Sequence, residues 1–206
     1  MRGYFRKTIL NKDKGLQAYV IGLALGDGNL SNPNGKATRL RITCDKKYPF
    51  LITKICKALE KLFPENKVSI VDRDKGCVDI SIYSNHFEKL LGWKAKNGSK
   101  FVQKVNVPNW IKENNNYKIN CLRGLIETDG SIYNDRGYTM MIFTSVIPAL
   151  AKDFYDMILS LEFNPHLYLI KRGKTAEYKY SQQDVYHIRL SKNVSKFLEL
   201  VKPEKI

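Results

Sequence analysis

Two aspartates, each followed directly by a glycine, are the residues of this sequence with the clearest capacity for chemistry. Asp27 ends the stretch AYVIGLALGDG, and Asp129 ends the similar stretch CLRGLIETDG half the chain later. Each stretch is predicted to be a helix, which should stop near Gly28 in a left-handed cap in the first copy. An acid at the negative end of the helix dipole costs a few tenths to about 1 kcal/mol. We therefore expect a function for these carboxylates, with a positive charge facing them.

Small residues recur at helical spacing in both stretches. Gly22 and Gly26 in the first copy correspond to Gly124 and Thr128 in the second. Small residues four apart let two helix backbones approach closely, so we expect the two helices to pack side by side, in the same direction. The two acids then emerge together. With the helix-end carbonyls of Gly26 and Thr128, they would form a site for Mg²⁺, which prefers one or two carboxylates plus water and phosphate oxygens.

Glu127 is a competing acid in the second stretch. It precedes Asp129 by two residues, about 200° around a helix, so the two cannot face one ion. Its counterpart in the first copy is Leu25. We expect Glu127 to be solvated or to form a local salt bridge.

The elements after each acid are also duplicated. The order helix, two strands, helix, two strands, helix occurs twice. The sequence thus predicts an α+β fold of two pseudo-symmetric αββαββα halves, each an antiparallel β-sheet covered by helices on one face. We place the halves at 1–97 and 117–206, joined by a polar linker over 98–116.

A single helical layer in each half would leave one face of each sheet open. Strand alternation assigns these residues to the core: Leu40, Ile42, Val68, Ile70, Val78, Ile80, Ile82, Leu167, Leu169, Tyr186, Ile188 and Leu190. The residues expected on or beside the open faces are basic or polar, as base edges and phosphates require: Arg39, Arg41, Lys67, Ser69, Arg73, Ser81, Tyr83, Ser131, Tyr133, His166, Tyr168, Arg172, Lys174, His187 and Arg189. An ordinary solvated sheet face is the competing interpretation.

Composition favours a nucleic-acid partner. The chain has 35 Lys and Arg against 20 Asp and Glu, a net charge of +15. An anionic membrane surface is the second partner that such a charge allows, but we expect nucleic acid and no membrane partner. No run approaches the roughly 18 apolar residues of a membrane span, so we expect an intracellular protein. The four cysteines and three histidines lack metal-ligand spacing, and we expect neither zinc nor disulfides.

VIGLALGDG and LRGLIETDG resemble the two signature motifs of LAGLIDADG homing endonucleases in their single-chain form. The resemblance implies a monomeric saddle over a long pseudo-palindromic or asymmetric site in double-stranded DNA. It also implies hydrolysis of both strands with short 3′ overhangs. The metal-binding acids would be Asp27 and Asp129, with Mg²⁺ or Mn²⁺ as cofactor and Ca²⁺ as an ion that binds without supporting cleavage.

The resemblance further implies a catalytic lysine after the last helix of each half. Lys104 and Lys202 lie at such positions, with Lys100 as a rival for the first. Asp45, at the end of the second strand, departs from the glutamine or lysine expected there. The sequence therefore does not identify the residues that position the attacking water.

Two other functions would keep the basic saddle: an intron RNA maturase and a DNA-binding protein that does not cleave. Both motif acids are retained, which favours the nuclease. The residues required for protein splicing are absent from the ends of the sequence, so we expect an intron-encoded or free-standing protein rather than an intein.

Overall fold

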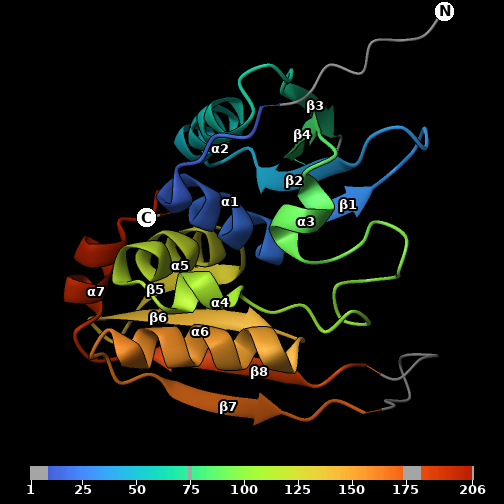
Figure 1. Cartoon of the computed structure of the whole chain (residues 1–206). Helices are drawn as coiled ribbons and strands as arrows, with labels where there is room; N and C mark the ends of the chain where they lie inside the picture. Colours follow the sequence, from blue (N-terminus) through green and yellow to red (C-terminus); the bar gives the residue numbers. More distant parts are fainter. Residues whose placement is uncertain (1–8, 74–75, 174–181, 206) are drawn as a thin grey trace, which may run out of the picture.

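The computed structural model describes residues 9–73, 76–173 and 182–205. The first half contains α1 (Lys14–Gly26), β1 (Gly28–Ser31), β2 (Arg39–Asp45), α2 (Pro49–Leu62), β3 (Ser69–Arg73), β4 (Cys77–Tyr83) and α3 (Phe87–Leu91). The short helix α4 (Asn109–Lys112) follows. The second half contains α5 (Asn115–Asp129), β5 (Gly130–Asp135), β6 (Tyr138–Ser145), α6 (Pro148–Ser160), β7 (His166–Ile170), β8 (Val185–Leu190) and α7 (Val194–Val201). The predicted α+β architecture with a repeated αββαββα order is confirmed (Figure 1).

The two sheets have the same topology. Their strand orders are β1-β2-β4-β3 and β5-β6-β8-β7, and every neighbouring pair is antiparallel. Helix α2 packs on the first sheet, and α6 and α7 pack on the second. Helices α1 and α5 lie against each other between the halves (Figure 1).

Local sequence signals start the helices where the structure needs them. The Asp13 side chain accepts a hydrogen bond from the Leu16 amide, at 3.0 Å, and caps α1. Asn114 caps α5 in the same way through the Tyr117 amide, at 3.2 Å. Helices α2 and α6 both begin with proline, whose missing N–H is harmless in the first turn. The paired helices of the two halves thus have matching start signals.

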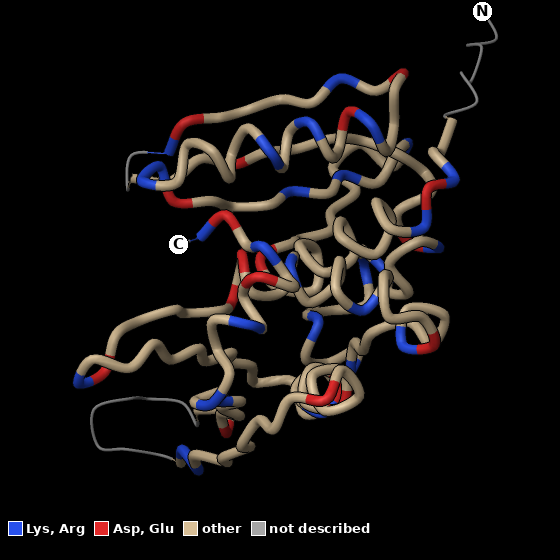
Figure 2. Tube along the Cα trace, turned by 90° about the vertical axis from the view of Figure 1, so that its left-hand side faces the viewer, with Lys and Arg blue, Asp and Glu red and all other residues tan. Residues whose placement is uncertain are grey.

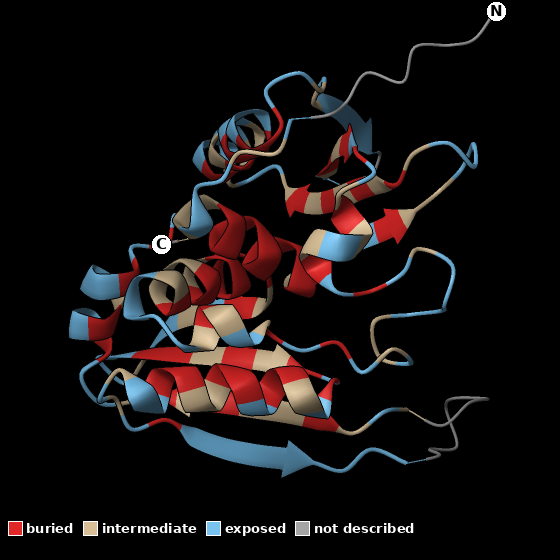
Figure 3. Ribbon diagram, viewed as in Figure 1, coloured by how far each residue is buried: buried red, intermediate tan, exposed pale blue. Residues whose placement is uncertain are grey.

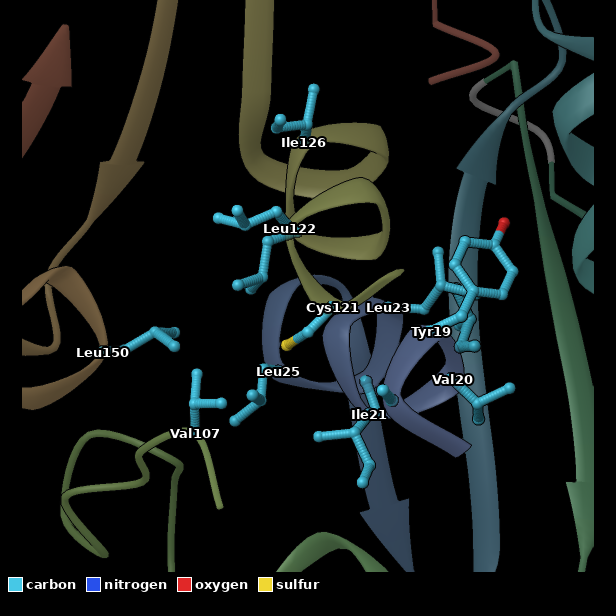
Figure 4. Packing of buried hydrophobic residues seen from close by; sticks show 14 of the residues in the cluster. Tyr19, Val20, Ile21, Leu23, Leu25, Val107, Cys121, Leu122, Ile126 and Leu150 are labelled. Atoms are coloured by element: carbon cyan, nitrogen blue, oxygen red, sulfur yellow. The ribbon is translucent and has the colours of Figure 1, made fainter. Parts of the chain in front are cut away.

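The apolar cores form around the two central helices. Figure 4 shows Leu25 and Leu122 pointing to the same side of the helix pair as Val107 and Leu150, whereas Tyr19 points away from them. These residues belong to one continuous cluster of buried side chains. The helix pair therefore contributes to the cores of both halves.

The burial prediction holds for the central strands and fails at the edges. The predicted core residues of β2, β4 and β8 are buried, apart from a half-buried Tyr186. In contrast, Ile70 is 54% exposed, Leu167 42% and Leu169 43%. Strands β3 and β7 lie at the sheet edges, and all their residues are exposed (Figure 3). Alternation identifies a strand but does not show whether a helix covers it.

Two further features concern the whole chain. No helix among the described residues has both the length and the hydropathy of a membrane span. All four cysteines are free thiols; Cys44 and Cys121 are buried, and Cys56 and Cys77 are half-buried.

Candidate active site and nucleic-acid interface

The contact between α1 and α5 depends on missing side chains. A Cβ atom at Gly22 would lie within 3.0 Å of the backbone oxygen of Cys121. One at Gly124 would lie 2.5 Å from the backbone oxygen of Tyr19. Gly26 faces the hydroxyl of Thr128, which itself bonds back to carbonyls of its own helix at 3.0 Å. All four small residues predicted at the helix interface are therefore placed in it.

Each central helix passes directly into a strand at its acid. The predicted left-handed cap at Gly28 is wrong, because Gly28 is already the first residue of β1 and is not among the glycines with positive φ. Glycine is needed there for close approach instead: a Cβ would lie 2.5 Å from the Cα of Ala24. Gly130 has the same relation to Ile126, with a distance of 2.6 Å to its carbonyl oxygen. The close approach of strand and helix at both glycines leaves each motif acid at the junction of a central helix with a strand.

The two acids meet at the base of the saddle. A carboxylate oxygen of Asp129 lies 3.2 Å from the point that a Cβ on Gly26 would occupy, so the acid of α5 lies against the end of α1. Asp27 is exposed and Asp129 is half-buried. Loss of hydration raises the pKa of both carboxyl groups, and that of Asp129 rises to about 6, with the charge of Asp27 adding to the effect. The pair thus has an electrostatic need for a cation.

A lysine reaches the end of each central helix. The Lys100 ammonium donates to the carbonyl oxygens of Leu25, at 2.7 Å, and Gly26. The Lys205 ammonium donates to those of Thr128, at 2.7 Å, and Gly130, at 3.0 Å. Burial lowers the pKa of Lys100, while the two aspartates oppose the shift. These ammonium groups are the positive charges that the sequence led us to expect.

The two lysines predicted as catalytic are not the ones that bond to the ends of α1 and α5. Lys104 lies in the loop before α4, beside Trp110 in a surface pocket, and Lys202 forms the C-cap of α7. Among the described residues, Lys100 and Lys205 are the lysines that donate to backbone carbonyls at the C-terminal ends of α1 and α5. Lys100 was the rival candidate, whereas Lys205 was missed because it lies beyond Pro203, where the course of the chain could not be anticipated.

The donor set at this site fits a hard divalent cation. A cavity of about 140 Å³ is lined by Asp27, Thr43, Asp45, Thr128 and Lys205, among others. Within the described ranges, no group of three or more His, Cys, Asp and Glu side chains could hold a metal. Asp27 and Thr128 line this cavity, and the Asp129 carboxylate lies against the end of α1. Two carboxylates completed by carbonyl and water oxygens would be a donor set that Mg²⁺ accepts. The ammonium groups already show that these carbonyls accept a positive charge.

The raised pKa of Asp129 predicts that the free energy of unfolding depends on pH. Because burial raises the pKa of Asp129 in the folded protein to about 6, from an ordinary value of 3.8 in the unfolded chain, ionisation of Asp129 destabilises the fold as pH rises through 6. Allowing for its partial exposure, Asp129→Asn should raise the free energy of unfolding at pH 8, without metal, by about 1 kcal/mol. The gain should be much smaller at pH 4.5.

Urea unfolding with a chelator at both pH values would check this. Glu65→Gln, which removes an exposed acid, is the control and should show no such pH dependence. Equal destabilisation of Asp129→Asn at both pH values would contradict the prediction.

The open sheet faces carry the predicted nucleic-acid residues in rows. Arg41 pairs with Ser81, which pairs with Ser69; Arg189 pairs with His166 in the second sheet. A second row in each sheet pairs residues two positions away: Arg39 with Tyr83, and His187 with Tyr168. The other predicted contacts lie on or beside the strands: Lys67, Arg73, Ser131, Tyr133 and Arg172. Lys174 lies outside the described residues.

The sheet face also contains an acid that sequence reasoning missed. Asp79 is 5% exposed and accepts hydrogen bonds from Thr43, at 2.8 Å, and Arg73, at 2.6 Å. It also forms an ion pair with Arg41, at 3.7 Å. Burial would raise its pKa, but these donors outweigh burial and lower it. Asp79 therefore orients two of the predicted DNA-contacting arginines. The sequence contains one indication of this role: Asp79 lies between the inward residues Val78 and Ile80, so strand alternation puts it on the outer sheet face with the arginines.

Two arginines on these faces keep an unused donor. The Nε atoms of Arg41 and Arg189 are buried and have no hydrogen-bond partner among the described residues. A buried donor without a partner is unfavourable, so a rearrangement of either side chain that brought its Nε to an acceptor would be favourable. Figure 2 shows that Lys and Arg (blue) and Asp and Glu (red) occur along the chain in both halves and gather where the halves meet.

Comparisons with known proteins support the same fold. Residues 116–202 match the family described as LAGLIDADG-like domain. No curated protein matches the chain. A variant of the homing endonuclease I-DmoI, solved with its target DNA and magnesium, superposes with a TM-score of 0.63 at 16% identity, over 92% of this chain and 96% of that chain. I-DmoI with DNA and manganese gives a TM-score of 0.62 at 16% identity, over 93% and 97%.

A second kind of protein has a related structure. Full-length DUF199/WhiA from Thermotoga maritima gives a TM-score of 0.59 at 12% identity, over 95% of this chain and 57% of that chain. At these identities the likeness is one of fold.

Proposed function

Because this chain carries a LAGLIDADG-like domain and has the two-half LAGLIDADG fold, we propose that it is a site-specific double-strand DNA endonuclease of the homing type. The observation that carries the proposal is the meeting of Asp27 and Asp129 at the ends of two closely packed helices, between two open sheets. I-DmoI has been solved with its target DNA and with magnesium, manganese or calcium. Divalent metal and duplex DNA are therefore the ligands to test first.

The substrate part of the proposal rests on charge and on the rows of side chains. A net charge of +15 favours a polyanion. The rows through Arg41 and Arg189 present donors across both sheets, and β-ribbons fit the major groove. The proposed partner is a long duplex site, pseudo-palindromic or asymmetric, bound by a monomer.

The chemical part assigns roles to residues at the base of the saddle. Asp27 and Asp129 would hold Mg²⁺ or Mn²⁺ together with helix-end carbonyls. Such an ion, when bound, activates water and stabilises the leaving oxygen of a phosphodiester. The Lys100 and Lys205 side chains donate to the helix-end carbonyls and interact electrostatically with both acids. We propose that they, in place of Lys104 and Lys202, are the lysines that face the scissile phosphates.

The duplicated arrangement sets the expected product. Each half supplies one motif acid, and one lysine lies at the end of each central helix, Lys100 from the linker and Lys205 from the C-terminal segment. Each acid and lysine would therefore serve one strand. Two cuts displaced along the duplex would leave short 3′ overhangs, the product implied by the family resemblance.

Cleavage of a randomised duplex library with Mg²⁺, followed by sequencing of the cut ends, would test the proposal. We expect staggered cuts at one recurring long site, and no cuts with Ca²⁺ alone. A double variant, Asp27→Asn with Asp129→Asn, is the matched control. Uncut but specifically retained DNA would overturn the nuclease in favour of a DNA-binding protein, and retention of intron RNA alone would indicate a maturase.

A further inference from the structure

We infer that Glu127 is a positioning residue, a buried latch that holds the C-terminal segment so that Lys205 reaches the end of α5. Its consequence for cleavage rests on the proposed function. The latch itself rests on contacts in the structure.

Glu127 receives donors from three separate parts of the chain. Its fully buried carboxylate accepts hydrogen bonds from the Tyr19 hydroxyl of α1, at 2.6 Å, and the Lys54 ammonium of α2, at 2.9 Å. The third donor is the backbone N–H of Glu204, at 2.8 Å. Burial and the adjacent carboxylate raise the pKa of Tyr19 well above its usual value, so its hydroxyl keeps the proton that it donates. The acid thus joins α1, α2, α5 and the C-terminal segment.

The Glu204 contact acts directly on Lys205. Donation from the Glu204 amide anchors the backbone immediately before Lys205, and Lys54 also pairs with the Glu204 side chain at 3.3 Å. From that anchor the Lys205 ammonium spans to the carbonyls of Thr128 and Gly130, on either side of Asp129. Lys205 lies on a tail beyond the last helix, so hydrogen bonds must supply the order that a helix would otherwise give.

The two halves differ at this point. The position of Glu127 is taken by Leu25 in the first copy, and Leu25 is an ordinary buried core residue. The corresponding lysine, Lys100, comes from the loop between α3 and α4, where its own carbonyl accepts from the Val105 amide at 3.2 Å. Removal of the latch should therefore affect one lysine and spare the other.

The first test measures the latch without any nuclease activity. Glu127→Gln keeps the size of the side chain and removes its charge. Amide exchange of Glu204, followed by NMR, should become at least about tenfold faster, as expected when a hydrogen bond to a charged group is weakened. Glu88→Gln is the matched control, since Glu88 also accepts a backbone N–H, from Ala95 at 3.0 Å, and pairs with a lysine. Unchanged exchange at Glu204 in folded Glu127→Gln would overturn the latch.

The second test resolves the two strands of a cleavable duplex. Glu127→Gln and Lys205→Met should slow cleavage of the same strand by about tenfold or more, and Lys100→Met should slow the other strand. In the Lys205→Met background, Glu127→Gln should have no further effect on strand choice. A uniform loss on both strands would indicate a structural role and overturn the positioning role.

A second variant covers the case in which Glu127→Gln does not fold. Glu204→Pro removes the donating N–H and leaves Glu127 bonded to Tyr19 and Lys54. It should reproduce the single-strand defect, and normal cleavage of both strands would overturn the inference. If the wild-type chain cuts no DNA, the proposed function fails, while amide exchange still decides the latch.

Discussion

Replacing both motif acids, Asp27→Asn with Asp129→Asn, is expected to reduce metal-dependent cleavage by about a thousandfold or more and to leave DNA affinity within about threefold. The carboxamides keep the shape of the side chains but carry no charge, so the helix ends lose the ligands that would hold the ion. The basic rows on the sheets are untouched. Cleavage rates and DNA retention, measured on the same preparations, check both halves of the expectation.

The control for this pair is Asp156→Asn on α6, where the acid pairs with Lys152 on the helical side of the molecule. It should cut at the wild-type rate. If the double variant still cut DNA at a rate comparable to the wild type, the two acids would not hold the catalytic metal. Weakened DNA retention in the double variant alone would instead assign them to binding.

Gly22→Ala is expected to destabilise the protein by about 3 kcal/mol or more. An alanine in a helix is normally favoured over glycine by about 0.5 to 1 kcal/mol, so helix propensity predicts the opposite sign. Here the added methyl would meet the backbone oxygen of Cys121 closer than 3.0 Å, and backbone cannot move aside as a flexible side chain could. The two central helices would have to separate.

Urea unfolding of Gly22→Ala beside Gly173→Ala would measure this effect. Among residues 9–73, 76–173 and 182–205, no atom lies within 4 Å of a Cβ added to Gly173, so its substitution should change stability by a few tenths of a kcal/mol at most. A Gly22→Ala protein as stable as the wild type would show that the helices are not in backbone contact. Such a result would also remove the geometric reason for the acids to meet.

Strand alternation fails to predict burial where burial depends on a distant element. Ile70, Leu167 and Leu169 alternate with polar residues as in a half-buried strand, yet they lie on edge strands and are exposed. Lateral position in a sheet is set by which strands pair. Pairing joins residues far apart in the chain, and alternation within one strand does not encode it.

The glycines after the acids show a different kind of error. Gly28 and Gly130 both follow a helix, which is typical of a left-handed cap. The structure uses them for close approach between strand and helix instead. Both uses need the absence of a Cβ, and only the path of the following chain distinguishes them.

The duplicated element order, the two acids at helix ends and the small residues between the helices are predictable from the amino-acid sequence, because these are local or repeated patterns. Three other features emerge only when the chain is folded: Lys100 and Lys205 face the acids, Asp79 orients the arginines, and Glu127 anchors the C-terminal segment. Lys205 and Glu127 are 78 positions apart in the chain, and nothing in the residues between them specifies their meeting. Such contacts depend on how loops and termini cross the folded surface, which is set by the packing of the whole molecule rather than by any local preference.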